Sequence, residues 1–508
     1  MVLLLGKSNQ AKLRKEYDMS DKILYYSEYG AAGDGISDDF DAIIRTHAAA
    51  NDLGLPVHAD PGATYYIGGG SKTAQIQTDT DWGTARFIID DTKVEDRNSY
   101  IFHVTSKHSP IRIDEVKSLK KNQENININL EFDSLVTAID DTTMRFIREG
   151  LNVDNGTQQT DVFIVNKKGE VDSQTAIIWD YTNITSLIAY PIDSETLTIQ
   201  GGHFTTIANQ EEPKYNYFSR NIAIQRSNVV INGLTHIITD EPEEHSAPYN
   251  GFIFIRECSN VKVQNCKMSA HKTYTTIGRA NLPVSMGSYD ILVNCAANIL
   301  FKDCVQLNDI TDNTKWGIFG SNFTKNITFD TVVFSRFDAH MGTTNPVIIN
   351  SEIGYMGIKL IGSGTCLIEN TKVIGNQFIS LRDDYGSTWE GEIIIRNCEL
   401  TPHKIRENNV IVLDARYSGM HDFGYACFMP RRIIIDGLVI NDYQSSDDYE
   451  GPRILSPIHT NYLDDSFKEK YPYALPEEIE IKGFVVKSGK KWVLSDNMYL
   501  FRNVKVGH

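Results

Sequence analysis

The feature that most constrains this chain is a short apolar strand that recurs from about residue 220 onward and ends each time at Asn or Asp. Eight such segments occur, among them VVINGL, VKVQNCKM, LIENTKV and IIIDGLVI. Their turn residues are Asn232, Asn265, Asp303, Asp330, Asn350, Asn370, Asn397 and Asp436, with separations of 33, 38, 27, 20, 20, 27 and 39 residues. A unit of about twenty residues with inserted loops is typical of a solenoid, in which each unit buries its apolar face only by stacking on its neighbours.

Asn and Asp suit these turns because their side chains tolerate left-handed backbone and bond to the local main chain. Stacked in register, they are expected to form a ladder along the solenoid. Three of the seven cysteines, Cys266, Cys304 and Cys398, directly follow a turn residue. This position favours buried packing thiols over a disulfide framework. The sequence contains no CxxC pair, so a structural zinc site is not expected.

The stretch 28–67, EYGAAGDGISDDFDAIIRTHAAANDLGLPVHADPGATYYI, has a different pattern. After a Gly-Asp-Gly turn, the segment from Ser37 carries acidic residues, which favour a helix N-terminus, and then apolar residues at helical spacing. Gly54 is expected to end this helix, and a Pro-Gly turn separates two short strands beyond it. Because a stack of coils leaves its first apolar layer and strand edge uncovered, we expect the helix to cap that end.

Two segments of this stretch, YGAAGDGISDDFDAI and GLPVHADPGATYYI, resemble the N-terminal signature of the pectate-lyase-like superfamily of right-handed parallel β-helices. That superfamily includes polygalacturonase-like glycosidases, polysaccharide lyases and phage tailspike depolymerases. The resemblance implies an all-β fold, a single-stranded right-handed parallel β-helix with an N-terminal capping α-helix. We expect residues 1–70 to form the cap and first strands, and residues 71–508 a β-helix with long loop insertions, together making one continuous domain. Within 100–200, DVFIVN and TAIIWDY are expected to be strands of the first coils.

The sequence also departs from the better-known members of that superfamily. The Gly-His-Gly segment typical of polygalacturonases is absent, and GIKLIGSG only faintly resembles their Arg-Ile-Lys strand. The sequence shows no clear set of calcium-binding aspartates paired with a catalytic arginine, as in pectate lyases, and no metal site is predicted. Candidate site residues must therefore come from the repeat itself.

Aligning the turns at Asp330, Asn350 and Asn370 places FSRFDAHMG, GYMGIKLIG and ISLRDDYGSTW as neighbouring strands of one sheet, with IVLDARYSGMHD one coil later. In this register one column contains Gly342, Gly362, Arg382 and, if the last coil carries a short insertion, Asp414, and the column beside it contains His340, Leu360, Ser380 and Val412. Lys359 and Asp383 would then point inward, which leaves open a bulge or a one-residue slip in those coils.

Charged and aromatic residues are concentrated in these coils. Residues two apart face the same side of a strand, so Asp338 points with His340, and Arg382 with Asp384. Aromatic rings beside polar groups suit sugars, whose apolar faces stack while their hydroxyls form hydrogen bonds. The catalytic candidates are Asp338, Asp384, Asp383, His340 and Arg382. The substrate-binding candidates are Arg336, Lys359, Tyr385, Trp389, Asp414, Arg416, Tyr274 and Arg279.

Loop lengths favour the same location. The coils that begin at Asn232, Asn265 and Asn397 run for 33, 38 and 39 residues, whereas those that begin at Asp330 and Asn350 run for 20. Long loops on both sides of short coils predict a groove whose floor is the short coils. The segments 269–290 and 416–432 would be its walls, with His421 or Asp422 as further contacts.

The leading functional prediction is glycan cleavage by hydrolysis, in which two carboxyl groups flank the glycosidic bond. Asp338 and Asp384 are the first pair, with Asp383 and Asp414 as substitutes. One alternative is β-elimination from a uronate polymer, with His340, Lys359, Arg336 or Arg382 as the base or the stabilising cation. No cofactor is predicted, although the elimination alternative allows a calcium ion. A third reading is a noncatalytic glycan-binding or tailspike-like structural protein.

Charge limits the partners. A formal net charge of −17 and a pI near 5.2 oppose nonspecific binding to nucleic acid or to a membrane surface. The superfamily resemblance and the candidate site residues imply a carbohydrate as the partner, and a monomer and a homotrimer both remain open. The first apolar run, MVLLL, is cut off by Lys7 and is too short for a signal peptide core or a membrane span. The cellular location thus stays open between the cell interior, another export route and a removed leader.

Overall fold

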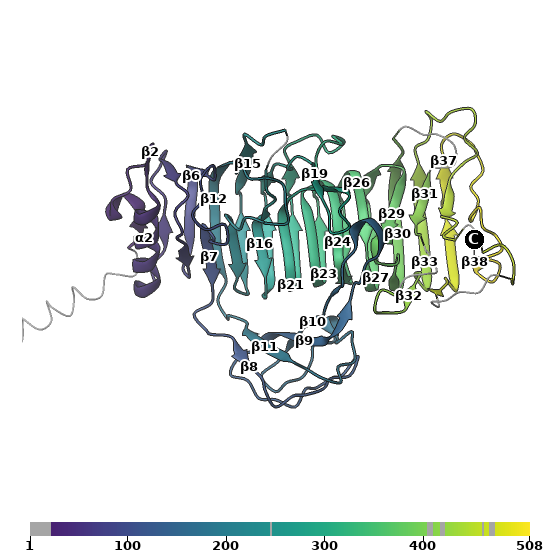
Figure 1. Ribbon diagram of the computed structural model, residues 1–508, viewed down its shortest axis with the longest axis horizontal. Coiled ribbons are helices and arrows are strands. Elements are labelled where there is room, and N and C mark those ends of the chain that lie inside the picture. Colours follow the sequence, from purple (N-terminus) through teal and green to yellow (C-terminus); the bar gives the residue numbers. More distant parts are fainter. Residues whose placement is uncertain are drawn as a thin grey trace, which may run out of the picture.

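The computed structural model describes residues 22–243, 246–403, 410–416, 422–459, 462–466 and 473–507. Their main body is a parallel β-helix, in which thirty strands form one hydrogen-bonded sheet that winds into stacked coils (Figure 1). Connections between parallel strands of one sheet are right-handed because the strand twist packs the returning chain back on the sheet only in that sense. The predicted all-β, right-handed parallel β-helix with an N-terminal capping helix is confirmed.

The described coils have three faces, each a stack of parallel strands. The first face contains β5 (Ala74–Ile76), β7 (Phe102–Thr105), β13 (Ile222–Gln225), β16 (Asn250–Arg256), β29 (Gln377–Leu381), β31 (Ile411–Asp414) and β34 (Arg453–Leu455). The second contains β1 (Leu24–Tyr25), β3 (Val57–His58), β14 (Val229–Asn232), β17 (Ser259–Gln264), β25 (Val347–Ile349), β27 (Gly362–Glu369), β36 (Glu478–Lys482) and β38 (Lys505–Gly507).

The third face contains β2 (Asp34–Asp38), β4 (Thr64–Ile67), β15 (Thr235–Thr239), β18 (Lys267–Met268), β22 (Val305–Gln306), β28 (Lys372–Ile374) and β37 (Val485–Val486). Longer strands turn a corner and so belong to two faces. They are β6 (Thr80–Asp90), β12 (Leu197–Ile207), β21 (Tyr289–Lys302), β23 (Phe319–Asp330), β24 (Val333–Thr344), β26 (Glu352–Leu360), β30 (Trp389–Thr401) and β33 (Arg432–Ile440). These shared strands make the stack one continuous body.

Between the second and third faces the chain turns through a left-handed residue on successive coils. On five coils that residue has φ between 48° and 54° and is Asn265, Asp303, Asn350, Asn370 or Asn397. Side-chain amides bond from coil to coil there, for example Asn370 Nδ2 to Asn350 Oδ1 at 3.2 Å. On three other coils the left-handed residue lies one position later than the aligned turn residue and is Gly233, Thr331 or Gly437. The ladder is confirmed, but the sequence alignment is one residue out at Asn232, Asp330 and Asp436.

Helix α2 (Phe40–Leu53) covers the first coil at the N-terminal end of the stack (Figure 1). It begins at Phe40 because the preceding residues form β2. Its buried face includes Ile43 and His47, and His47 Nε2 lies 2.9 Å from the Tyr26 hydroxyl in the short helix η1 (Tyr26–Tyr29). The helix ends at Gly54, which has a φ of 68°, as predicted. The helix therefore caps the apolar layer of the first coil.

The segment 106–196, between β7 and β12, leaves the β-helix and forms a separate antiparallel sheet, here called the insertion. In sheet order its strands are β10 (Thr157–Val165), β9 (Ser134–Arg145), β11 (Ser186–Pro191) and β8 (Ile111–Arg112), and it also contains η2 (Gly150–Asn152) and η3 (Ser173–Thr175). The expectation that DVFIVN and TAIIWDY are strands of the first coils is wrong. DVFIVN lies in β10, which pairs antiparallel with β9, and TAIIWDY forms no strand. Alternation marks a strand but does not tell which sheet it joins.

The insertion packs along the corner between the first and second faces (Figure 1). It emerges there because β7 belongs to the first face and β12 begins on the second. A buried ion pair joins it to the β-helix, with Lys325 Nζ on β23 2.8 Å from Asp161 Oδ1 on β10. Leu135 and Val162 also pack on Ala297. The tip of the insertion thereby reaches coils that lie far along the sequence.

Two pairs of short strands lie in loops of the later coils, outside the main sheet. β19 (Tyr274–Ile277) and β20 (Pro283–Met286) form an antiparallel hairpin, and β32 (Cys427–Phe428) pairs with β35 (Tyr473–Ala474). None of the helices in the described ranges is long and apolar enough to cross a membrane. The predicted division at residue 70 within one continuous domain stays a prediction.

Candidate functional site

A column of polar side chains faces outward on the first face, in the coils where the site was predicted. Asp338 on β24 pairs with Lys359 on β26, Lys359 with Ser380 on β29, and Ser380 with Asp414 on β31. The residues on either side of each of these four are apolar and buried. Because side chains alternate along a strand, the four polar residues point away from the core. We call them the first-face column.

The columns predicted from the sequence are wrong. Gly362 pairs with Thr343, and Arg382 lies beyond the end of β29. One cause is the turn at Thr331, and the other is an irregularity between Phe334 and Arg336, where β26 gains residues relative to β24. The slip that the sequence left open is therefore present, and it turns Lys359 outward. Asp383 lies in η4 (Asp383–Tyr385) and not on an inward-facing strand position.

Asp338 lies at the base of the column, and its side chain is fully buried. It accepts hydrogen bonds from Arg382 Nη1 at 2.6 Å, from the Tyr289 hydroxyl at 2.7 Å and from Arg336 Nη2. Burial opposes ionisation, but the positive charges of Arg336 and Arg382 outweigh it and hold the pKa of Asp338 well below its usual range. Asp338 is thus a charged anchor, and this geometry argues against the expected catalytic role because no part of the side chain is open to a substrate.

Arg382 connects Asp338 to Asp384. Its Nε and Nη2 bond the two carboxylate oxygens of Asp384 at 3.0 and 2.8 Å, while Nη1 bonds Asp338. Arg148, near the tip of the insertion, lies 3.3 Å from Asp384 Oδ2. Burial alone would raise the pKa of Asp384, but the charge of Arg382 outweighs it and lowers the pKa. Asp384 is therefore ionised, and both of its oxygens are held.

His340 lies beside this group and is half-buried. Its Nδ1 is 3.1 Å from Asn322 Oδ1, and its Nε2 is 3.4 Å from the Tyr385 hydroxyl. Because a carbonyl oxygen only accepts, this network assigns the ring proton to Nδ1. Burial, assisted by the charge of Arg382, lowers the pKa of His340 to about 3. The imidazole is therefore neutral at neutral pH and does not supply a proton as a cation.

The pKa shifts of Lys359 and Asp414 favour their uncharged forms, whereas those of the two anchored carboxylates favour the charged form. Burial, assisted by the charge of Arg336, lowers the pKa of Lys359. Burial raises the pKa of Asp414 more than Arg416 lowers it, and the negative charge of Asp383 adds to the rise. The Asp383 side chain is 57% exposed and lies 3.8 Å from Arg416 Nη1. Asp414 thus takes up a proton more readily than the two anchored carboxylates, next to a carboxylate that is open to solvent.

Three predicted substrate-binding residues are buried in the structure. Trp389 is fully buried in the core, and its Nε1 donates to a main-chain carbonyl at 3.2 Å. Arg336 is 3% exposed and lies over the Trp316 ring at 4.9 Å, and Tyr385 is 2% exposed. These side chains offer no surface to a ligand. Arg336 and Tyr385 do lie beside Asp338 and His340. The sequence could not show the depth of any of the three residues, because depth depends on the segments packed above them.

The residues predicted to contact substrate from the loops lie in different places: Arg279 contacts the insertion, whereas Arg416 lies beside Asp383. Arg279 follows β19 and is ion-paired with Asp154 of the insertion. Arg416 is exposed beside Asp383. His421 lies outside the described residues, and Asp422 is exposed, with its carboxylate accepting from the Gly424 N–H at 2.9 Å. The groove predicted over the short coils stays a prediction.

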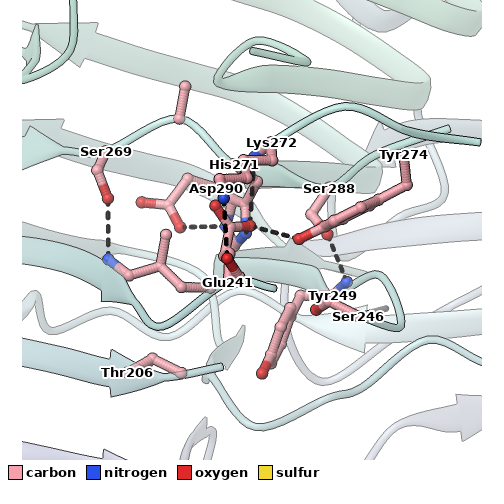
Figure 2. Close-up of polar contacts among 12 residues, drawn as sticks. Thr206, Glu241, Ser246, Tyr249, Ser269, His271, Lys272, Tyr274, Ser288 and Asp290 are labelled. Atoms are coloured by element: carbon pink, nitrogen blue, oxygen red, sulfur yellow. Dashed lines mark hydrogen bonds and ion pairs between the residues drawn. The ribbon is translucent and has the colours of Figure 1, made fainter. Parts of the chain in front are cut away.

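Tyr274 lies in a second group, which we call the buried cluster: His236, Glu241, His271, Tyr274 and Asp290. Figure 2 shows its centre, where the Tyr274 hydroxyl donates to Glu241 at 2.7 Å and His271 bridges Glu241 and Asp290 at 3.3 and 3.2 Å. His236 Nδ1 lies 2.8 Å from Asp290. Burial alone would lower the pKa of His271, but the hydrogen bonds to Asp290 and Glu241 outweigh it and raise the pKa to about 9. The Tyr274 hydroxyl is hydrogen-bonded within this network, and Tyr274 does not reach the first-face column.

Two residues of the site were missed by sequence reasoning. Tyr289 opens β21 and donates to Asp338, and Arg148 reaches Asp384 from the insertion. Neither carries a local signal, because Tyr289 comes from an earlier coil than the aligned strands and Arg148 comes from the insertion. Among the described residues, no group of three or more His, Cys, Asp and Glu side chains is arranged to hold a metal ion.

No protein-family model and no curated protein matches the sequence. Solved structures resemble it in fold. The tailspike protein gp49 from Pseudomonas phage LKA1 has a TM-score of 0.48 at 13% identity, over 91% of this chain and 81% of that one. The gp54 tailspike of Acinetobacter baumannii bacteriophage AP22, solved with A. baumannii capsular saccharide, has a TM-score of 0.46 at 10% identity over 98% and 80%. PfbA, a surface adhesin of Streptococcus pneumoniae, has a TM-score of 0.41 at 12% identity over 91% of each chain.

Proposed function

We propose that this protein hydrolyses glycosidic bonds, with Asp414 as the general acid and Asp383 as the partner carboxylate. The observation that supports this choice is the raised pKa of Asp414 beside the exposed Asp383, in a site where the other two carboxylates are held ionised by arginines. Glycosidases need one carboxyl that stays protonated and one that does not, and environments that separate their pKa values assign the two roles.

The chemistry follows from these assignments. Asp414 donates its proton to the glycosidic oxygen as the bond to the anomeric carbon breaks, and Asp383 either deprotonates the attacking water or attacks the anomeric carbon itself. Asp338 and Arg382 are positioning residues. Arg382 is bonded to both Asp338 and Asp384 and so fixes the start of η4, which carries Asp383.

The test is product analysis in ¹⁸O-labelled water. The full chain is incubated with neutral and anionic plant, algal and bacterial polysaccharides, and the products are measured by mass spectrometry. Hydrolysis gives products that gain one labelled water. Asp414→Asn is expected to lower the rate by about 10²–10⁴-fold, because it removes the proton donor, with an unchanged melting temperature. Asp436→Asn, at an exposed turn on another corner, is the matched control and should leave the rate unchanged.

Each contrary result has a defined meaning. A full rate in Asp414→Asn contradicts its role as the acid. Unsaturated products without the label replace hydrolysis by elimination. No product from any polysaccharide leaves glycan binding without turnover as the better account of the site.

Elimination from a uronate polymer is the second candidate, and the lowered pKa of Lys359 favours it. A lowered pKa eases loss of the ammonium proton, and the free amine would remove the proton next to the uronate carboxyl group while a cation such as Arg382 stabilises the charge that develops. Lys359→Gln separates the two candidates. Elimination would be lost in this variant, whereas hydrolysis by the two carboxyl groups would continue at a reduced rate.

A further inference from the structure

A cavity of about 300 Å³ lies between the insertion and the corner of the β-helix that it covers. Three separate parts of the chain line it. The floor is the corner itself, where Thr324 pairs with Thr343 and Thr343 with Gly362 on successive coils. Trp179 comes from the insertion, and Tyr425 follows from a later loop. We call this cavity the corner cleft.

The walls of the corner cleft are aromatic. Trp179 is half-buried, and one face of its ring is covered by the Arg145 guanidinium, whose Cζ lies 4.6 Å from the ring centroid. Arg145 in turn donates to Gln159 at 2.9 Å and to the carbonyl of Gly424. The further aromatic residues that line the cleft are Phe146, Phe323, Tyr425 and Phe428. Trp179 is therefore held in one orientation, as a stacking surface needs.

The cations of the cleft are already engaged within the protein, two of them by carboxylates and Arg145 by the neutral carbonyl oxygens of Gln159 and Gly424. Lys121 Nζ lies 2.7 Å from Glu390 across the rim, where both side chains are about half-exposed. Lys325 is bound to Asp161 in the floor, and Arg145 is engaged as described. Because each of the three lining cations already has a partner, a phosphate or a polyanion gains little here. A neutral ligand with apolar faces is better matched.

Hydroxyl groups complete the lining. Thr344 and Ser363, on neighbouring coils, present hydroxyls 3.3 Å apart, and both side chains are partly exposed. A hydroxyl both donates and accepts, so this pair is able to bond the hydroxyls of a ligand as well as each other. Aromatic faces, hydroxyls and a wall whose cations are already hydrogen-bonded together suit the recognition of a neutral sugar ring.

We propose that the corner cleft binds a neutral mono- or disaccharide unit of a glycan, with Trp179 as its stacking surface. The volume is at the lower end of the range for ligand pockets, which begins at about 300 Å³. The cleft adjoins the candidate site, because Phe146 lines the cleft and also packs on Tyr385 of η4 at 5.5 Å. The inference rests on the proposed function to the extent that the ligand is a glycan, and it adds a second binding position to that site.

The test is affinity electrophoresis of the full chain in gels that contain a neutral glucan, a xylan, a galactomannan or the anionic polygalacturonate. At least one neutral polysaccharide should retard the protein. Trp179→Ala should weaken the binding about tenfold, because a stacking contact contributes up to about 1.5 kcal/mol. Trp179→Phe, which keeps a ring, should retain most of the binding. Tyr443→Ala is the control, since Tyr443 is an aromatic side chain that is 67% exposed elsewhere.

A second variant guards against misfolding of the first. Ser363→Phe fills the cleft from the β-helix side and should abolish retardation while the melting temperature stays unchanged. Retardation by no neutral polysaccharide, or equal retardation of the parent and both variants, overturns the inference. Asp414→Asn separates it from the proposed function. If retardation depends on Trp179 but no glycan is cleaved, the hydrolysis proposal is wrong and the binding proposal is supported. If cleavage depends on Asp414 but retardation does not depend on Trp179, hydrolysis is supported and the binding proposal is wrong.

Discussion

The first-face column and the buried cluster each contain a carboxylate that is held by two nitrogen-bearing side chains. Asp338 lies between Arg336 and Arg382, and Asp290 between His236 and His271. Their surroundings differ. Lys359, Asp383 and Asp414 reach the surface around the first carboxylate, whereas the side chains of the buried cluster that contact Asp290 are at most 2% exposed.

This difference shows that burial and a shifted pKa are not sufficient to identify a functional site. Both groups contain strongly shifted residues, so a shifted pKa alone does not mark a functional site. In the buried cluster every charge is used to satisfy another, and the network has no group left for a ligand. Around the first-face column, the anchored carboxylates of Asp338 and Asp384 likewise neutralise arginines. They also lie beside Lys359, Asp383 and Asp414, whose side chains remain accessible to a ligand. The open neighbours, rather than the anchors, are the functional candidates.

The largest expected effect is on stability. Asp290→Ala should lower the free energy of unfolding by about 3–5 kcal/mol, because it leaves the positive charge of His271 buried with one partner fewer. Asp414→Ala should change it by less than about 1 kcal/mol, because the residue lies at the surface of the column. Urea denaturation followed by circular dichroism measures both. Equal losses in the two variants would break the comparison, since Asp414 would then be as structural as Asp290.

The fold was predictable to the extent that it repeats. A left-handed turn residue favours Asn for local steric reasons, so the sequence itself marks these turns. The turns at Asn265, Asn350 and Asn370 were predicted correctly. Thr331 was not, because a threonine at a left-handed position carries no such signal and Asp330 beside it does. Together with the irregularity between Phe334 and Arg336, that residue shifted the aligned strands, so the prediction placed Lys359 on the wrong side.

The candidate site was predictable as a cluster but not as a set of roles. Its charged residues come from neighbouring coils of one repeat, so their proximity follows from the repeat. The role of each depends on contacts between distant segments. Asp338 is an anchor because Tyr289 and two arginines surround it, and Asp384 is held partly by Arg148 of the insertion. The insertion was taken for coils, so neither its contacts with the site nor the corner cleft had a sequence signal.

The two groups should also respond to pH in opposite directions. The pKa of His271 is raised to about 9 in the folded protein, facing Glu241 and Asp290. Its contribution, roughly 3 kcal/mol, is therefore fully present below the ordinary histidine pKa of about 6.5 and is lost as the pH rises through 9. The pKa of His340 is lowered to about 3, so stability falls as the pH decreases from about 6.5 towards 3, because only the unfolded chain binds that proton.

Urea midpoints between pH 4 and pH 10 measure this behaviour, and two variants assign it. His271→Gln should remove the loss of stability between about pH 6.5 and 9 and leave the acid side unchanged. His340→Gln should reduce the acid loss and leave the alkaline side unchanged. An alkaline loss that persists in His271→Gln would show that the buried cluster does not hold its proton on that histidine.

The smallest expected effects come from a matched pair of tyrosines. Tyr274→Phe and Tyr289→Phe each remove one hydroxyl that donates at 2.7 Å to a buried carboxylate, of Glu241 and Asp338 respectively. Each should lower the free energy of unfolding by about 1.5 kcal/mol, since both acceptors keep other donors. Turnover separates them. Tyr289→Phe should lower it a few-fold, because Asp338 positions Arg382 and through it η4, whereas Tyr274→Phe should leave it unchanged. An equal loss of turnover in both variants would place the buried cluster inside the functional machinery and remove the distinction between anchors and open neighbours.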